Sequence, residues 1–156
     1  MKCGFYFLRG KTSAWAEAAA EEYTTKISNY IPFKREGLKS KLAERSKFEE
    51  KRRAEAEAIL SKINPRDFVI LFDESGRAFK NSIEFSREIV KTIESGANRL
   101  VFIIGGPYGF DERVTAVARA RWSLSLLTMN HHVAQIAALE QIYRALTIWK
   151  GVPYHN

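Results

Sequence analysis

The sequence predicts an α/β domain built on a mostly parallel β-sheet. Two short, continuously apolar runs, FVILF at 68–72 and LVFII at 100–104, are typical of strands buried on both faces. Stretches with helical periodicity separate the predicted strands, an order that favours parallel pairing. With 156 residues, 46% of them hydrophobic, the chain suffices for one domain with a sizeable core, and a wholly disordered chain is excluded.

The first elements are a strand, a helix and a second strand. The strand is predicted at 3–8, where an aromatic-rich run ends before Gly10. A helix is predicted over 13–27, because a serine cap precedes a run rich in alanine. The second strand is predicted at 31–35, although Pro32 interrupts it.

A long, strongly charged helix comes next and leads into the first buried strand. It contains Phe48 and is predicted to end near Ile63, because Pro65 cannot continue it. After the strand at 68–72, the polar sequence DESG at 73–76 predicts a turn.

Two further helices and a strand are predicted in the second half. An amphipathic helix begins at a Ser82 cap and stops near Gly96. After the strand at 100–104, Asp111 can cap a short helix rich in small residues. The sequence WSLSLL predicts a last strand at 122–127, and a long helix then runs over 131–149.

Ligands of parallel α/β sheets bind beyond the carboxyl ends of the strands, and three loops are expected there. They contain 72–73, 105–107 and 125–130. Paired glycines in the sequence GGPYG let the backbone approach a ligand closely, although such a sequence is also typical of an ordinary strand-to-helix turn. The spacing is not GxGxxG, and the chain has no GxxxxGK[ST] motif for nucleotide phosphates.

The charge indicates a polyanionic partner. Lys and Arg number 25 against 18 Asp and Glu, which gives a net charge of +7. Residues 39–53 hold seven basic and three acidic side chains, typical of either a solvated helix face or a phosphate-binding surface. A single cysteine, Cys3, excludes an internal disulfide framework and gives no zinc cluster.

Other features limit the location and the chemistry. No apolar stretch approaches the ~20 residues of a membrane span, and the N-terminus does not resemble a signal peptide, so a cytoplasmic setting without a membrane is expected. His131 and His132 diverge on a helix, so no shared metal is expected. Arg144 lies four residues after Glu140, which indicates either a surface ion pair or a functional group. The tail, 149–156, is aromatic and contains a proline, unlike most frayed ends.

Three motifs carry a resemblance to a known family. IIGGPYGF at 103–110, WSLSLLT at 122–128 and LEQIYRALTIWKGVPYHN at 139–156 resemble the ribosomal large-subunit pseudouridine N3-methyltransferases (family H) of the SPOUT superfamily. The resemblance covers the whole chain, 1–156, and implies a single SPOUT domain with a trefoil knot formed by roughly residues 100–156. It further implies a homodimer and the cofactor S-adenosyl-L-methionine.

The resemblance also implies a set of site residues. The cofactor would be bound by residues of the three loops named above: Phe72, Asp73, Gly105, Gly106, Ser125, Leu126, Leu127, Thr128, Met129 and Asn130. The catalytic residues would be Arg144, Tyr154 and His155, with His155 acting either as the base for the acceptor proton or as a clamp on the base edge. The tail is expected to lie over the mouth of the cofactor pocket, and no metal is required.

The implied reaction is methylation of N3 of a pseudouridine in 23S rRNA on the assembled ribosome, with Lys11 and residues 39–53 contacting the rRNA. The chain departs from the family at Asn130, where proline is common, and at Gln135, where arginine is common. Two other classes stay open from the residues alone. One is a non-catalytic RNA-binding module, and the other is an α/β enzyme that binds a small anionic substrate at the glycine turn.

Overall fold

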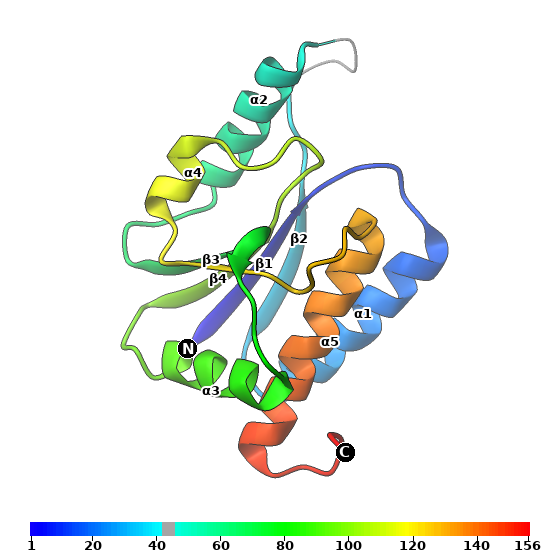
Figure 1. The fold of residues 1–156 in the computed structure, drawn as a ribbon, viewed down its shortest axis with the longest axis vertical. Coiled ribbons are helices and arrows are strands. Elements are labelled where there is room, and N and C mark those ends of the chain that lie inside the picture. The colour runs from blue at the N-terminus through cyan, green and yellow to red at the C-terminus, as the bar shows by residue number, and fades with distance from the viewer. Residues whose placement is uncertain (42–45) are drawn as a thin grey trace.

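The computed structural model describes residues 1–41 and 46–156 and has three layers, a parallel sheet between two layers of helices (Figure 1). The strands are β1 (Lys2–Leu8), β2 (Phe33–Leu38), β3 (Asp67–Arg77), β4 (Arg99–Ile104) and β5 (Ala120–Trp122). The helices are α1 (Ala14–Ser28), α2 (Phe48–Leu60), α3 (Ser82–Ile93), α4 (Glu112–Val117) and α5 (His131–Lys150). The prediction of an α/β fold with a parallel sheet is confirmed.

The sheet has the strand order β2-β1-β4-β3-β5, and all its pairs are parallel. Strand β4 lies between β1 and β3, which explains its continuous apolar sequence. Leu100, Phe102 and Ile104 face one hydrophobic core, whereas Val101 and Ile103 face the other. Successive side chains of a strand point to opposite faces, so both faces must be covered for such a run to be buried.

Each face of the sheet is covered by its own set of helices (Figure 1). Helices α1, α3 and α5 cover one face, and α5 contributes the buried Leu139, Ile142 and Leu146 to that core. Helices α2 and α4 cover the other face, with Ile59 and Val114 buried beneath them. In the described part of the chain, no helix is both long enough and apolar enough to span a membrane. The knot stays a prediction.

The turn predicted at 73–76 is wrong, because β3 continues to Arg77. Both Phe72 and Arg77 pair with Trp122 of β5, so the polar residues between them form a bulge within the strand. A Cβ atom on Gly76 would lie 2.6 Å from the carbonyl carbon of Arg121, which explains why the bulge needs glycine at that position.

The strand predicted at 122–127 is also wrong, since β5 ends at Trp122. The Ser123 hydroxyl donates a hydrogen bond to the carbonyl of Ser125, and the Leu127 N–H donates to the Ser125 hydroxyl. Such local bonds between serine and the backbone compete with the hydrogen-bonding ladder of a sheet. The segment therefore turns away from β3 and crosses the carboxyl edge of the sheet as a loop.

Smaller differences concern the ends of elements. Strand β2 starts two residues later than predicted, and α2 ends at Leu60, three residues earlier than predicted. Asn81, not Ser82, caps α3 by accepting a hydrogen bond from the Glu84 N–H. Ser13 occupies the cap position of α1 but makes no side-chain capping bond.

The basic segment 39–53 is not a single helix. Residues 39–41 precede α2, residues 42–45 lie outside the described residues, and of the described residues in this segment those at 48–53 are helical.

Candidate functional site

A cavity of about 580 Å³ lies beyond the carboxyl ends of β3 and β4. Phe72 and Ile104, the residues where the two apolar runs end, are register partners, which places the bulge of β3 and the glycine turn after β4 side by side. The third wall is the segment between β5 and α5. We call this space the β3–β4 cavity, and its position agrees with the rule for ligand sites in parallel sheets.

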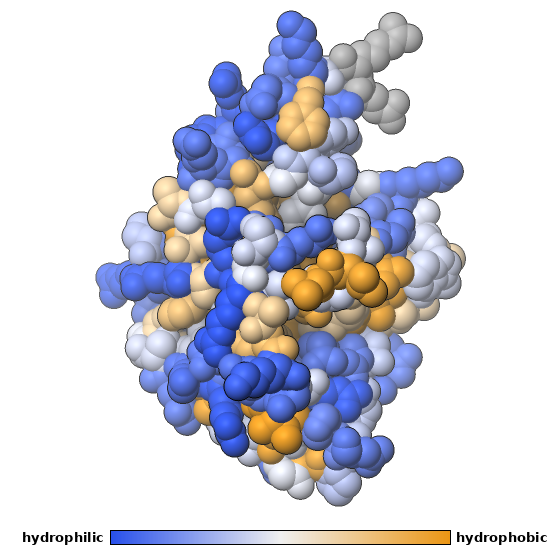
Figure 2. Space-filling view, viewed as in Figure 1, coloured by the Kyte–Doolittle hydropathy of each residue, from blue (hydrophilic) through white to orange (hydrophobic). Residues whose placement is uncertain are grey.

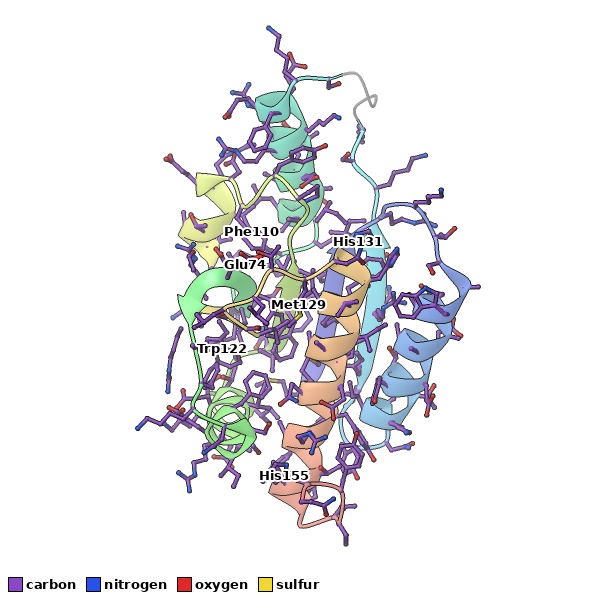
Figure 3. The ribbon with its side chains drawn as sticks, turned by 45° about the vertical axis from the view of Figure 1, so that its right-hand side comes forward. Glu74, Phe110, Trp122, Met129, His131 and His155 are labelled. Carbon is purple, nitrogen blue, oxygen red and sulfur yellow. The ribbon has the colours of Figure 1, made fainter. Side chains whose placement is uncertain are left out.

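The β3–β4 cavity gathers most of the residues for which cofactor binding was predicted. Its lining includes Phe72, Asp73, Gly105, Gly106, Ser125, Leu127, Thr128, Met129 and Asn130. Leu126 does not line it; its side chain points outward and is 85% exposed. The role of these residues in binding stays a prediction, but three segments far apart in the sequence do form one site. Figure 3 shows Glu74, Phe110, Met129 and His131 near one another in the middle of the view, well away from His155.

The glycine turn has a shape that side chains would prevent. A Cβ on Gly105 would lie 2.8 Å from the ring of Phe110. Gly109 has a φ of +74°, a conformation that favours glycine. Asp111 then caps α4 by accepting a hydrogen bond from the Arg113 N–H, as predicted. The turn therefore brings bare backbone to the wall of the cavity.

The loop from Ser123 to Asn130 is held by bonds of its own. The serine bonds described above fix its first part, and Asn130 caps α5 by accepting a hydrogen bond from the His132 N–H. Asparagine thus supplies a cap at the position where the family commonly has proline. The loop also reaches the bulge of β3, since the Thr128 hydroxyl lies 3.5 Å from a carboxylate oxygen of Glu74.

The electrostatics of the β3–β4 cavity contrast with those of the whole chain. Despite the net charge of +7, no Lys or Arg is among the described residues that line it, and its ionisable side chains are Asp73, Glu74 and His131. Burial by itself would raise the pKa of Asp73, but hydrogen bonds from Arg121 and Ser75 together hold it below its ordinary value. The cavity suits a neutral or cationic ligand and disfavours the small anionic substrate of one alternative interpretation.

The three residues with predicted catalytic roles form a separate cluster with Glu140. Arg144 donates two hydrogen bonds to one Glu140 oxygen, at 3.0 and 2.6 Å, and the Tyr154 hydroxyl donates to the same oxygen at 3.0 Å. The Arg144 guanidinium also lies 3.1 Å from Nδ1 of His155 and 4.7 Å from the Tyr154 ring centre. The ion-pair interpretation of Arg144 is confirmed, and its functional role stays a prediction.

Charge and hydrogen bonding define the state of this cluster. The hydrogen bond with Glu140 raises the pKa of Arg144, so the guanidinium stays charged. Burial, followed by the bond to Glu140, raises the pKa of Tyr154, so its phenol stays protonated. Guanidinium is only a donor, so Nδ1 of His155 must accept, and a neutral His155 ring then carries its proton on Nε2. The exposed His155 thus presents an N–H donor to solvent.

Within one chain, the tail lies away from the mouth of the β3–β4 cavity, so the expected placement of the tail over that mouth stays a prediction that needs a second copy of the chain. His131 at the start of α5 lines the cavity, whereas Arg144 lies thirteen residues further on, about 20 Å along the axis at 1.5 Å per residue. Figure 3 shows His155 at the opposite end of α5 from Met129 and His131. The helix is too long and straight to bring the two groups together in one copy.

Sequence reasoning missed two acidic residues. Glu140 was interpreted only as the partner of Arg144, yet it also binds Tyr154. Glu55 is only 8% exposed, although it belongs to the helix that the sequence predicts to be strongly charged. A signal for it existed, because Glu55 lies four residues before the apolar Ile59 and shares its helix face. Among the described residues, no group of three or more His, Cys, Asp or Glu side chains could hold a metal ion.

A family model and the named relatives indicate the same family for this chain. The family model described as "Predicted SPOUT methyltransferase" matches residues 1–155. A protein of Bdellovibrio bacteriovorus named Ribosomal RNA large subunit methyltransferase H is 44% identical over 156 residues, which is 100% of this chain and 99% of that protein. A protein of the same name from Parabacteroides distasonis is 38% identical over 158 residues, again 100% of this chain and 99% of the relative.

A solved structure is also similar. The chain aligns with the structure described as "Crystal structure of probable rRNA-methyltransferase from Porphyromonas gingivalis", with a TM-score of 0.52 and 13% sequence identity. The alignment covers 95% of this chain and 69% of that chain. At this identity, the likeness supports the fold alone.

Proposed function

Since this chain belongs to the SPOUT methyltransferase family, we propose that it methylates the ribosomal RNA of the large subunit with S-adenosyl-L-methionine as donor. The family model and the relatives confirm the family resemblance that the three C-terminal motifs carry. The acceptor in this proposal is N3 of a pseudouridine in 23S rRNA within the ribosome. The observation that carries the proposal is the β3–β4 cavity, built from the bulge of β3, the glycine turn and the loop before α5, and free of Lys and Arg among its described lining residues.

The lining of the β3–β4 cavity fits the donor. Apolar side chains such as Phe72, Leu124 and Phe110 can enclose an adenosine, while the glycine turn and the loop before α5 offer backbone groups to its polar edges. The carboxylates of Asp73 and Glu74 favour the positive charge of a sulfonium. When bound, the cofactor supplies the electrophilic methyl group, so the chain must bind it, orient the acceptor and accommodate a proton.

The distance between cavity and tail supports a homodimer with composite sites. In this arrangement, the tail of one copy lies over the β3–β4 cavity of the other. Large apolar side chains near the cavity are strongly exposed, notably Leu126, Leu127 at 76% and Trp15 at 61%. Figure 2 shows an apolar patch where the segment before α5 crosses this face. Such a patch on a highly charged chain is typical of a surface that another protein covers.

The tail cluster then has defined roles at the acceptor. Arg144 and the Nε2–H of His155 can donate to the uracil oxygens, which develop negative charge as N3 loses its proton. Tyr154 keeps its proton and can stack on or hydrogen-bond the nucleotide. In this state, His155 acts as a clamp, while breaking its bond to Arg144 would free Nδ1 to act as a base.

The basic surface completes the proposal. Lys39 and Lys41 precede α2, and its first turns carry Lys51, Arg52 and Arg53. A ribosome presents dense phosphate charge, so this surface is expected to anchor the enzyme and to make binding weaken with salt. A non-catalytic RNA-binding module would share this property but would bind no methyl donor.

The test is transfer of a labelled methyl group from S-adenosyl-L-methionine to purified ribosomes or to free 23S rRNA, followed by mapping of the modified nucleotide. We expect a methylated pseudouridine at one position, formed on ribosomes. His155→Ala should lower turnover at least about tenfold with nearly unchanged donor affinity, and deletion of residues 154–156 should abolish turnover while sparing the fold. No label in RNA, or unchanged turnover of both variants, would contradict the proposal.

Mixed dimers test whether the site is composite. Gly105→Val, which fills the cavity beside Phe110, is mixed with His155→Ala after each variant is shown to be folded. In a mixed dimer, one of the two sites combines an intact cavity with an intact tail. Random exchange should therefore restore about a quarter of the wild-type activity. Activity no greater than the sum of the separate variants would mean that the tail of one copy does not complete the cavity of the other, contrary to the proposal.

A further inference from the structure

A second cavity adjoins the β3–β4 cavity across the glycine turn. It has a volume of about 360 Å³ and lies beyond the ends of β1 and β4, so we call it the β1–β4 cavity. The two cavities share Ile104, Gly105, Gly106, Pro107 and His131 as lining residues. A ligand in the first cavity therefore has the second as its immediate neighbour.

The β1–β4 cavity contains a buried carboxylate that has no partner among the described residues. Glu55 projects from α2, is more than nine-tenths buried, and makes no hydrogen bond or ion pair with any described residue. Its two oxygens lie 2.5 and 2.6 Å from the position that a Cβ on Gly106 would occupy. Glycine at 106 thus makes the space that the carboxylate fills, and the carboxylate faces the wall shared by the two cavities.

Such a group is costly unless something binds it. Burying an ionised carboxylate without a hydrogen-bond donor is strongly unfavourable. Burial accordingly raises the pKa of Glu55 to about 7. On the same cavity, Nε2 of His131 is buried and has no hydrogen-bond partner among the described residues. Two unpartnered polar groups therefore flank one turn.

The charges of the β1–β4 cavity indicate what it binds. Its cationic lining residues, Arg9 and Lys51, are combined with the anionic Glu55. A phosphate would be repelled by Glu55, and an uncharged base would leave these charges without counterparts. A zwitterion with an ammonium and a carboxylate group matches both signs.

We propose that the β1–β4 cavity receives the amino-acid end of the methyl donor, with Glu55 accepting hydrogen bonds from its ammonium group. This inference rests on the proposed function, because it assigns a second part of the same ligand. The adenosine occupies the β3–β4 cavity, and the amino-acid end passes the glycine turn. Arg9 and Lys51 provide the positive field for its carboxylate.

Two ligands that differ only at this end test the proposal by titration calorimetry. S-adenosylhomocysteine carries the amino acid, whereas 5′-methylthioadenosine lacks it. Glu55→Gln should weaken binding of S-adenosylhomocysteine at least about tenfold and leave that of 5′-methylthioadenosine within about twofold. Glu57→Gln, an exposed carboxylate on the same helix, is the matched control and should change neither.

Wild-type protein gives a second readout that needs no variant. An ammonium beside Glu55 favours its ionised form, so binding of S-adenosylhomocysteine near pH 7 should release about half a proton, measured in buffers of different ionisation enthalpy. Binding of 5′-methylthioadenosine should release none from this group. Glu55→Gln should abolish the release.

The outcomes separate the two proposals. Equal weakening of both ligands would mean that Glu55 only shapes the glycine turn, and no weakening would mean that the amino acid lies elsewhere; either result overturns the inference while the proposed function stands. If wild-type protein bound neither ligand, the proposed function would fail together with the inference.

Discussion

Replacing Glu55 with glutamine should change the pH dependence of stability in a defined direction. The pKa of Glu55 is raised to about 7 in the folded chain from an ordinary value of 4.5, and the cause is burial. The folded protein therefore keeps a proton that the unfolded chain releases. The stability associated with this proton is fully present below pH 4.5 and is lost as the pH rises through about 7.

The magnitude follows from the interval between these two values. At about 1.4 kcal/mol per pH unit, the full interval corresponds to about 3.5 kcal/mol of unfolding free energy, of which about 2.5 kcal/mol is lost between about pH 5 and about pH 8.5. Lys51, Arg9 and His131 line the same cavity, but none of them donates a hydrogen bond to Glu55 in the described structure. Burial therefore decides the direction in which the pKa of Glu55 shifts, which is upward.

Thermal unfolding of wild type and Glu55→Gln without ligand, from about pH 5 to about pH 8.5, is the assay. The Tm of the variant should rise relative to the Tm of the wild type as the pH increases, by about 5 to 10 °C over this range for a domain of this size. The amide of the variant's glutamine would be buried without a partner and would shift the Tm by the same amount at every pH. Only the change with pH in the Tm difference between variant and wild type is therefore diagnostic. Glu57→Gln should run parallel to the wild type. A difference between Glu55→Gln and wild type that does not grow with pH would refute the assignment of Glu55 as a buried, unpartnered acid.

Three further predictions concern the sheet, a buried ion pair and the apolar patch. Gly76→Ala should destabilise the protein by about 1–3 kcal/mol in chemical unfolding, because its Cβ would meet the backbone of Arg121 at 2.6 Å; unchanged stability would mean that the bulge can shift. Arg99→Met should cost about 3–5 kcal/mol, because the nearly inaccessible side chain of Asp67 would lose its ion-pair partner, and adding Asp67→Leu should recover most of the loss. Leu127→Glu should lower the dimer fraction in sedimentation at fixed concentration without lowering the Tm of the monomer; an unaltered dimer would exclude this patch from the interface.

Local sequence pattern was sufficient to predict the two central strands and the last helix. The runs at 68–72 and 100–104 are apolar at every position, so they predict buried strands however the rest of the chain packs. The last helix was predicted to begin at His131 and does so, because apolar residues recur at helical spacing behind the Asn130 cap. The same logic predicted that loops following the two runs would meet at one edge of the sheet.

Where two patterns compete locally, the sequence alone was misleading. The segment 122–127 has the alternation of a strand, but its serines bond to their own backbone and end β5 at Trp122. The polar residues 73–76 are typical of a turn, but pairing of Arg77 with Trp122 keeps them within β3. Both outcomes depend on a neighbouring strand that local pattern does not contain.

The sequence by itself determined the fold class, the glycine turn and, through its motifs, the family of this protein. Only the tertiary structure decided which charged residue of α2 is buried, because burial of Glu55 depends on the glycine turn packing against that helix. Tertiary structure also separated the tail from the β3–β4 cavity, since the rigid length of α5 fixes the distance between residues that the motifs place in one site. Periodicity and motif are local properties of the chain, whereas burial and separation are properties of the packed molecule.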